Sequence, residues 1–248
     1  HLPKSIVEDS KDQLLNTTAM KGASVGIAIF DEQHQSWVEK HNSDHYFTPA
    51  SNTKIISCYV GFKFLGDSLD SWKKKETRDS IYLYPLGDPT FMHPEFSYQP
   101  IASLIASTSK QVVLCLPNQP DQFTPYGQGW AWDDYPEDYQ PERSRLSLFG
   151  NVVNFVTDAD YIIASLIMND ELHPQKPIVV MQGIDMSRAS VVKSGPTDQM
   201  LHIMMHRSDN FFAEQVVLMA TEKILGTINE EKGRDTIKKM IFSSLPQY

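Results

Sequence analysis

The spacing of apolar residues in the first part of the chain predicts a helix, a β-hairpin and a second helix. Residues 4–15 place their apolar side chains on one face of a short amphipathic helix. Residues 24–30 and 36–40 are typical of two strands joined by the polar turn 31–35, which predicts a hairpin. After a loop that contains a proline, the run 55–65 is apolar and long enough for a helix.

From about residue 80 the pattern changes to short strand-like pieces between proline-rich loops. The strand-like pieces are residues 81–84, 111–116 and 178–181, and a long aromatic and acidic loop covers residues 123–143. Many turns between short elements are typical of a separate α+β module.

The C-terminal part of the chain returns to helical spacing. Pro196 stands where a helix begins, and a second helix is predicted over residues 211–225 with Gly226 as its C-terminal cap. Helices on both sides of the middle module predict an α/β (α+β) fold with two domains. We expect a main domain from residues 1–77 and 187–248, with residues 78–186 inserted into it.

Composition narrows the class of protein without assigning a function. The chain has 248 residues, 22 Lys+Arg against 31 Asp+Glu, and 41% hydrophobic residues, which is typical of a folded protein. No apolar run approaches the ~20 residues that span a bilayer, and the net charge of −9 argues against nucleic acid as a partner. The basic cluster 73–75 is interpreted as a solvated helix end, and Cys58 and Cys115 as buried thiols.

A serine followed three residues later by a lysine stands where the loop before residue 55 meets the apolar helix. In the segment Ser51-Asn52-Thr53-Lys54 the lysine lies over the same helix face as the serine. Such a pair can act as nucleophile and base if the pKa of the lysine is lowered. The spacing alone is weak, because it occurs four times in the chain, and a helix cap with a solvated lysine is the ordinary alternative.

A second candidate segment, Ser208-Asp209-Asn210, is the only Ser-x-Asn in the chain and lies between two predicted helices. A short loop there can present a hydroxyl and an amide to a cleft. The same residues can also simply cap the helix that follows. The combination of Ser51 and Lys54 with Ser208 and Asn210 is more selective than either segment alone.

This combination resembles the penicillin-binding proteins and serine β-lactamases. Residues 47–54 (FTPASNTK) and 204–214 (MMHRSDNFFAE) are similar to the first and second motifs of the low-molecular-mass D-alanyl-D-alanine carboxypeptidases/endopeptidases that carry a large inserted domain. Residues 87–90 (GDPT) and 129–134 (GWAWDD) resemble segments of that insertion. The resemblance implies a β-lactamase/DD-transpeptidase-like domain with an inserted α+β module.

The resemblance also implies roles for single residues. Ser51 would attack the penultimate D-Ala of a peptidoglycan stem peptide and form an acyl-enzyme, and Lys54 would take its proton. Ser208 would relay that proton to the leaving amine, and Asn210 would hold Lys54 and the substrate backbone. β-Lactams would inhibit by acylating Ser51.

The acidic loop adds candidate substrate contacts. By resemblance, Asp134, with Asp133 beside it, would approach the side-chain amine of the stem peptide, and Tyr139 would form an apolar wall. The alternative is a solvated acidic loop whose Trp130 and Trp132 are anchored in the core of the module.

The family's third motif, a Lys-Thr/Ser-Gly strand after the Ser-x-Asn segment, is not found where it is expected. Residues 193–195 (KSG) precede Ser208 and are interpreted as a loop leading into the helix at Pro196. Only 38 residues follow Asn210, and none of their runs is strand-like. We therefore expect that the native chain continues past residue 248 with the missing C-terminal strands; a short, inactive homologue is the competing interpretation.

The remaining patterns are weaker. His202 and His206 have a spacing that can chelate zinc but lack a third ligand, so no metal and no cofactor are expected. The leading prediction is a periplasmic or extracytoplasmic serine DD-peptidase, although the given chain shows no signal peptide. A non-catalytic peptidoglycan-binding or structural homologue is the alternative, and a β-lactamase is a third. The sequence leaves the oligomeric state open.

Overall fold

The computed structural model describes residues 4–135, 137, 139–151 and 160–243. The chain divides into two compact units, residues 1–50 and 51–248. The first unit contains α1 (Lys4–Leu15), the short 3₁₀ helix η1 (Thr18–Met20), and the strands β1 (Ile27–Asp31) and β2 (Ser36–His41). The predicted helix and hairpin are confirmed.

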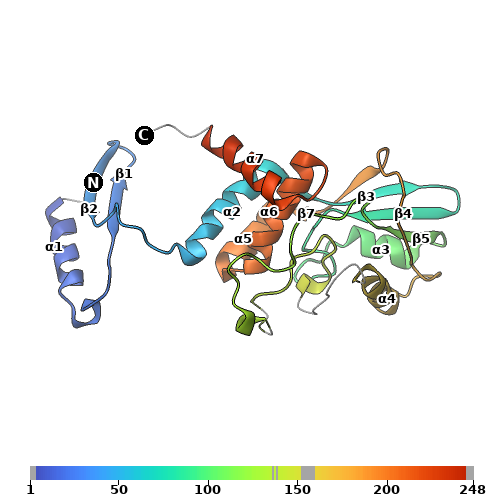
Figure 1. Cartoon of the computed structure of the whole chain (residues 1–248), viewed down its shortest axis with the longest axis horizontal. Helices are drawn as coiled ribbons and strands as arrows, with labels where there is room; N and C mark the ends of the chain where they lie inside the picture. The colour runs from blue at the N-terminus through green and yellow to red at the C-terminus, as the bar shows by residue number, and fades with distance from the viewer. Residues whose placement is uncertain (1–3, 136, 138, 152–159, 244–248) are drawn as a thin grey trace. The chain divides into compact units, whose positions relative to one another are not determined.

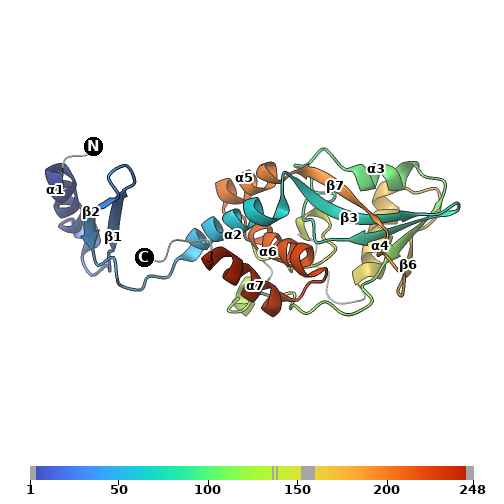
Figure 2. The same ribbon diagram turned by 90° about the horizontal axis from the view of Figure 1, so that it is seen from above.

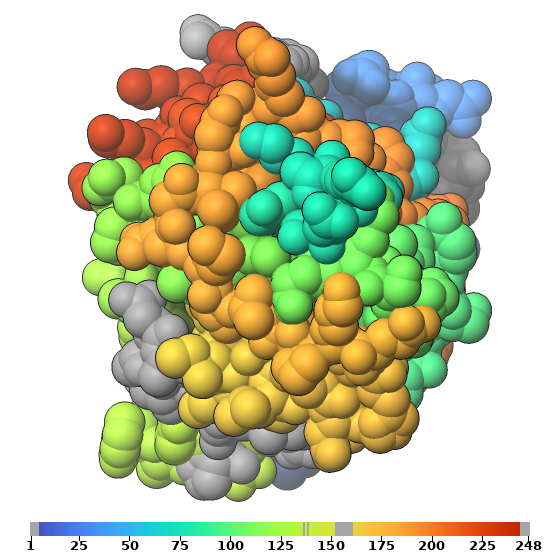
Figure 3. Space-filling model, turned by 90° about the vertical axis from the view of Figure 1, so that its right-hand side faces the viewer, coloured from blue at the N-terminus to red at the C-terminus, as the bar shows by residue number. Residues whose placement is uncertain are grey.

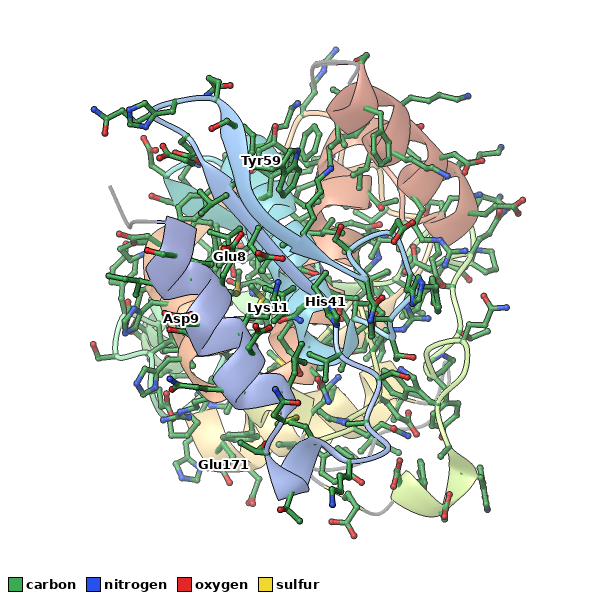
Figure 4. All side chains as sticks on the ribbon, turned by 90° about the vertical axis from the view of Figure 1, so that its left-hand side faces the viewer. Glu8, Asp9, Lys11, His41, Tyr59 and Glu171 are labelled. Carbon is green, nitrogen blue, oxygen red and sulfur yellow. The ribbon has the colours of Figure 1, made fainter. Side chains whose placement is uncertain are left out.

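The hairpin of the first unit is antiparallel and is joined to its helix by a charged contact. Ile27 pairs with His41, and the register shifts by a bulge after Ile29. Lys11 lies on the side of α1 that faces β2 (Figure 4), where its Nζ is 3.1 Å from Glu39 Oε1. A polar contact of this kind fixes the helix on the hairpin although few of its apolar side chains are buried.

The second unit begins with a helical segment and continues into a sheet with two covering helices. The segment consists of η2 (Ala50–Thr53), α2 (Lys54–Val60) and the π-helical turn η3 (Gly61–Leu65). The sheet contains β3 (Ser68–Glu76), β4 (Ser80–Pro85), β5 (Gln111–Cys115), β6 (Val179–Met181) and β7 (Ser190–Pro196). Between these strands lie α3 (Pro100–Ser107), η4 (Trp132–Asp134), η5 (Phe149–Asn151) and α4 (Asp160–Leu172). The helices α5 (Thr197–Arg207), α6 (Asn210–Leu225) and α7 (Glu230–Phe242) follow the sheet.

The sheet is mixed, with the strand order β6-β5-β4-β3-β7. The strands β4, β5 and β6 are parallel, whereas β3 is antiparallel to both β4 and β7. Ile81 and Leu83 alternate on β4 and share a core with Ile105 of α3 and Met168 of α4. Figure 3 looks onto the end of this unit, where the β3–β4 turn, α4 and the segment leading into β7 form one continuous surface.

A second core lies among the helices α2, α5, α6 and α7, which gather beside the sheet (Figures 1 and 2). α6 lies at its centre, with Phe212 and Val216 almost fully buried. Gly61 allows the close packing of the first helical segment against α5, because a Cβ there would lie 2.7 Å from a methyl carbon of Leu201. This contact sets the distance between the helix that carries Lys54 and the two helices that meet at residue 208.

The structure corrects two interpretations of the sequence. Residues 193–195 are not a loop but part of β7, where Val191 and Val192 pair with Lys73 and Trp72 of β3. Lys73, Lys74 and Lys75 are not at a helix end but on β3, where they find carboxylate or carbonyl partners. In both cases the pairing joins segments more than 100 residues apart, which local periodicity does not report.

The structure also bears on the predicted helices, the two cysteines and the domain division. The helices predicted after residues 54, 196 and 210 are confirmed, and Gly226 caps α6 with a φ of 72°. Both cysteines are free thiols, Cys115 buried and Cys58 half-buried. The division at residues 77 and 187 stays a prediction, and strands from outside 78–186 pair with strands inside it. No helix in the described ranges is long and apolar enough to cross a membrane.

Candidate active site

Ser51 and Lys54 lie on the turn where η2 passes into α2. Ser51 is in η2 and is exposed, whereas Lys54 is the first residue of α2 and is only 5% exposed. Because Lys54 is three positions after Ser51 along a helical path, both side chains lie on one face. Lys54 Nζ is 3.2 Å from Ser51 Oγ and donates a hydrogen bond to it.

Ser208, Asp209 and Asn210 form the connection between α5 and α6, and each has a separate structural task. Ser208 adopts the left-handed conformation, with a φ of 57°, and ends α5. The carboxylate of Asp209 accepts a hydrogen bond from Phe212 N at 2.8 Å and caps α6, and Asn210 is the first residue of that helix. The capping role is therefore carried by Asp209, which leaves the side chains of Ser208 and Asn210 free for other contacts.

These two segments, 157 residues apart in sequence, meet at Ser51. Ser208 Oγ donates to Ser51 Oγ at 2.8 Å, and Lys54 Nζ donates to Asn210 Oδ1 at 2.5 Å. Ser51 thus has a hydroxyl and an amine within hydrogen-bond reach, the geometry that an activated serine nucleophile requires.

The environment of Lys54 favours its neutral form. Burial lowers the pKa of Lys54, because the ammonium loses water, and the carboxylates of Asp209 and Glu214 oppose this shift only in part. The shift makes Lys54 a better proton acceptor for Ser51 than an ordinary surface lysine.

The acidic loop reaches the same cluster through Tyr139. The amide Nδ2 of Asn210 donates to the main-chain carbonyl of Tyr139 at 3.0 Å, and the Tyr139 hydroxyl donates to Asp134 Oδ1 at 2.7 Å. The bond to Asp134 raises the pKa of Tyr139 to about 12. Asp133 is exposed beside Asp134 on η4.

Trp132 does not anchor this loop in a core as the alternative interpretation expects, whereas Trp130 is half-buried. Trp132 is 79% exposed and stacks on Tyr135, with 5.4 Å between the ring centroids. Tyr139, predicted as an apolar wall, makes its hydrogen bonds through its hydroxyl and its carbonyl.

A cavity of about 510 Å³ opens beside this cluster, within the size range of small-ligand sites. Its lining includes Ser208, Asn210 and Tyr139, together with His93 and Arg207, which the sequence did not single out. Burial lowers the pKa of His93, and Arg207 forms an ion pair with a carboxylate two residues after His93. The only sequence signal for this wall was the position of Arg207 beside the Ser-x-Asn segment.

Residues 193–195 (KSG), which have the composition of the family's third motif, lie on β7. Lys193 is half exposed and pairs with Asp70 at 2.9 Å, and Ser194 Oγ accepts from Thr90 Oγ1 at 3.4 Å. Within the described part of the chain, no hydrogen bond or ion pair joins either residue to Ser51 or Lys54. His202 and His206 stack on each other on α5, and the described residues hold no group of three metal-binding side chains.

Comparisons with known proteins identify similar folds and a family. Two crystal structures of penicillin binding protein 4 (dacB) from Haemophilus influenzae are similar in fold, and one of them is a complex with a β-lactam. The first is 14% identical with a TM-score of 0.67 and covers 88% of this chain and 67% of that one. The β-lactam complex is 13% identical with a TM-score of 0.58 and covers 93% of this chain and 69% of that one. No curated protein sequence matches the chain.

A sequence profile decides the family. Residues 7–188, which include Ser51 and Lys54, match the profile of the D-Ala-D-Ala carboxypeptidase 3 (S13) family. The match covers well over half of the 248 residues. It confirms the resemblance drawn from the motifs: the chain belongs to the D-Ala-D-Ala carboxypeptidase 3 (S13) family of serine peptidases.

Proposed function

We propose that this carboxypeptidase cleaves the D-Ala-D-Ala end of peptidoglycan stem peptides through an acyl-enzyme on Ser51. The observation that carries the proposal is the position of Ser51 Oγ, 3.2 Å from Lys54 Nζ and 2.8 Å from Ser208 Oγ. The proposed nucleophile is thus within hydrogen-bond distance of both the proposed base and a second hydroxyl. Because its substrate lies outside the cytoplasmic membrane, the protein would act there.

In the first step, Ser51 Oγ attacks the carbonyl carbon of the penultimate D-Ala as Lys54 Nζ accepts its proton. The tetrahedral intermediate then collapses: the peptide C–N bond breaks, and the proton passes by way of Ser208 to the amine of the terminal D-Ala. An ester between Ser51 and the shortened peptide remains. Water, deprotonated by the same lysine, hydrolyses this ester and restores the free serine.

The electrostatics of the site support Lys54 as the base. A base must be unprotonated to start the reaction, and the buried position of Lys54 lowers its pKa toward that state. The exposed positions of Ser51 and Asn210 leave these two groups accessible to a peptide. We assign Asn210 to hold Lys54 and the substrate backbone.

Substrate recognition is assigned to the acidic loop. Asp134 has one carboxylate oxygen bonded to Tyr139, which leaves the other oxygen available for the side-chain amine of a stem peptide. Asp133 adds negative charge next to it, and Tyr139 lines the adjacent cavity.

The test is acylation by a β-lactam, which carries the same reactive amide. The whole protein is incubated with a penicillin and digested, and mass spectrometry locates the adduct. We expect a stoichiometric adduct on the peptide that contains Ser51 and none in Ser51→Ala. An adduct absent from the wild-type protein, or present at another residue, overturns the proposal.

One observation favours a second candidate, a peptidoglycan-binding protein without catalysis. Lys193, in the Lys-Ser-Gly segment 193–195, is engaged with Asp70, and within the described residues it makes no hydrogen bond to Ser51 or Lys54. This candidate predicts that the protein binds cell-wall fragments equally well in wild-type and Ser51→Ala forms, while peptide hydrolysis stays undetectable in both. Hydrolysis of a D-Ala-D-Ala peptide by the wild-type protein alone rules it out.

A further inference from the structure

Four hydrogen bonds connect the acidic loop to the nucleophile by way of Tyr139, Asn210 and Lys54. Asp134 accepts from the Tyr139 hydroxyl, and the Tyr139 carbonyl accepts from Asn210 Nδ2. Asn210 Oδ1 then accepts from Lys54 Nζ, which also donates to Ser51 Oγ. From Lys54 to Asp134 each residue donates to the next one, and Lys54 also donates in the other direction, to Ser51.

The path decides which end of the Asn210 amide faces Lys54. A side-chain amide presents an acceptor on one side and donors on the other, and rotation by half a turn exchanges them. A main-chain carbonyl can only accept. The Tyr139 carbonyl therefore holds Nδ2 on its own side and leaves Oδ1 toward Lys54.

We infer that Tyr139 is a positioning residue, which acts through Asn210 to set the orientation of Lys54 toward Ser51. This inference rests on the proposed function, because Lys54 matters as the base of the acylation step. Within the described residues Tyr139 makes no hydrogen bond to Lys54 or Ser51, and its carbonyl connects it to Lys54 through Asn210.

Tyr139 needs a tether in order to do this. Its side chain is 51% exposed and Asn210 is exposed as well, so close packing does not fix either of them. The hydroxyl bond to Asp134, five residues earlier on η4, is the contact that fixes the ring. Without this bond we expect the carbonyl to move away and water to compete for the Asn210 amide.

Loss of the bond between the Asn210 amide and the Tyr139 carbonyl affects Lys54 in two ways. An amide that rotates presents Nδ2 instead of Oδ1, so protonated Lys54 loses an acceptor and its pKa falls further. The carboxylates that face Lys54, Asp209 and Glu214 on α6, stay in place in that case. At the same time Lys54 Nζ loses the contact that aligns it with Ser51 Oγ, and the acylation rate falls.

The experiment measures acylation of the whole protein by a fluorescent penicillin as a function of pH. Tyr139→Phe and Asp134→Ala each remove the tether, and we expect the plateau rate to fall about five- to tenfold, the loss of one net hydrogen bond. Tyr135→Phe is the matched control, because it removes a hydroxyl of the same loop that bonds to Glu142 and not to this path.

The pH profile separates positioning from general loosening of the loop. We expect the acidic limb of the profile to move to lower pH in Tyr139→Phe and Asp134→Ala, and to stay in place in the control Tyr135→Phe. The ¹³C shift of the Lys54 side chain, followed by NMR, reports the same change of pKa without any reaction.

Two results overturn the inference. One is an unchanged rate and limb in Tyr139→Phe and Asp134→Ala while the wild-type protein still forms its Ser51 adduct. The other is an equal loss in Tyr135→Phe. If the wild-type protein forms no adduct, the proposed function fails, and the NMR titration alone then decides whether Tyr139 controls Lys54.

Discussion

Replacing Asn210 by aspartate tests the role of Lys54 most directly. The two side chains have the same shape, so Asn210→Asp keeps an acceptor oxygen about where Oδ1 lies, 2.5 Å from Lys54 Nζ. It adds one negative charge beside the buried amine. The charged form of Lys54 is then stabilised, and its pKa rises.

The size of this change follows from the distance and the exposure. An opposite charge at hydrogen-bond distance shifts a pKa by about 1 to 3 units, each worth about 1.4 kcal/mol. Because Asn210 is exposed, water screens the new charge, and we expect about 1 to 2 units. Below the new pKa the neutral fraction of Lys54 drops in proportion, so acylation near pH 7 should slow about 10- to 100-fold.

The assay is the acylation rate of the whole protein with a fluorescent penicillin over a wide pH range. In Asn210→Asp the acidic limb should move to higher pH. The rate should recover on the alkaline side up to the about five- to tenfold loss expected because aspartate cannot donate to the Tyr139 carbonyl. Asp209→Asn is the opposite control, since its carboxylate raises the pKa of Lys54. Asparagine still caps α6, and removing the charge should move the limb to lower pH.

The assignment of Lys54 as the base is refuted if the acidic limbs of the pH–rate profiles of Asn210→Asp and Asp209→Asn do not move in opposite directions. A rate that falls equally at every pH in Asn210→Asp also contradicts it, because that result means a loss of geometry and not a change of protonation. Ser51→Ala provides the background rate.

Three further predictions concern stability and its conflict with activity. Lys54→Met should abolish acylation without lowering the melting temperature. In the wild-type protein, and not in this variant, the free energy of unfolding should rise with pH between the lowered pKa of Lys54 and its ordinary value near 10.4. In that range the unfolded chain binds a proton on Lys54 that the folded chain does not bind. Ser208→Gly should raise the free energy of unfolding by about 0.5–1 kcal/mol in urea titrations, since glycine adopts a φ of 57° without strain, and should slow acylation. Arg145→Met should lower that free energy by about 3 kcal/mol, because it removes a partner of the buried Glu222, which keeps Lys73, and breaks both bonds of the guanidinium to Asp121.

Local pattern was sufficient to predict α2, α5 and α6, and the two motifs with their family resemblance named Ser51, Lys54, Ser208 and Asn210 as candidates. Apolar spacing locates the helix that begins at Lys54, because its length and its neighbours in sequence decide it. The two motifs locate Ser51 and Ser208 in sequence. Their contact at 2.8 Å depends on the packing of α2 against α5 and α6, which only the folded chain provides.

The errors fall where long-range pairing decides the structure. Residues 193–195 have the composition of a turn, yet β3 pairs with them across more than 100 residues and makes them a strand. Lys73 lies in a basic cluster that suggests a solvated helix end, yet its amine bonds to Glu222 of α6 at 3.3 Å. The contact of Tyr139 with Asn210 uses a main-chain carbonyl, and such a contact leaves no mark on the identity of the residue.

Two of the proposed catalytic residues, Lys54 and Ser208, also occupy positions that cost stability in their own helices. Lys54 is an ammonium-bearing side chain only 5% exposed, at a helix start where a neutral residue would be buried at lower cost. Ser208 ends α5 in a conformation that favours glycine. The neighbouring Asp209, by contrast, makes an ordinary and favourable helix cap. Since local stability alone selects neither Lys54 nor Ser208, the reason for both must lie in what their side chains do together, and they meet at a single atom, Ser51 Oγ.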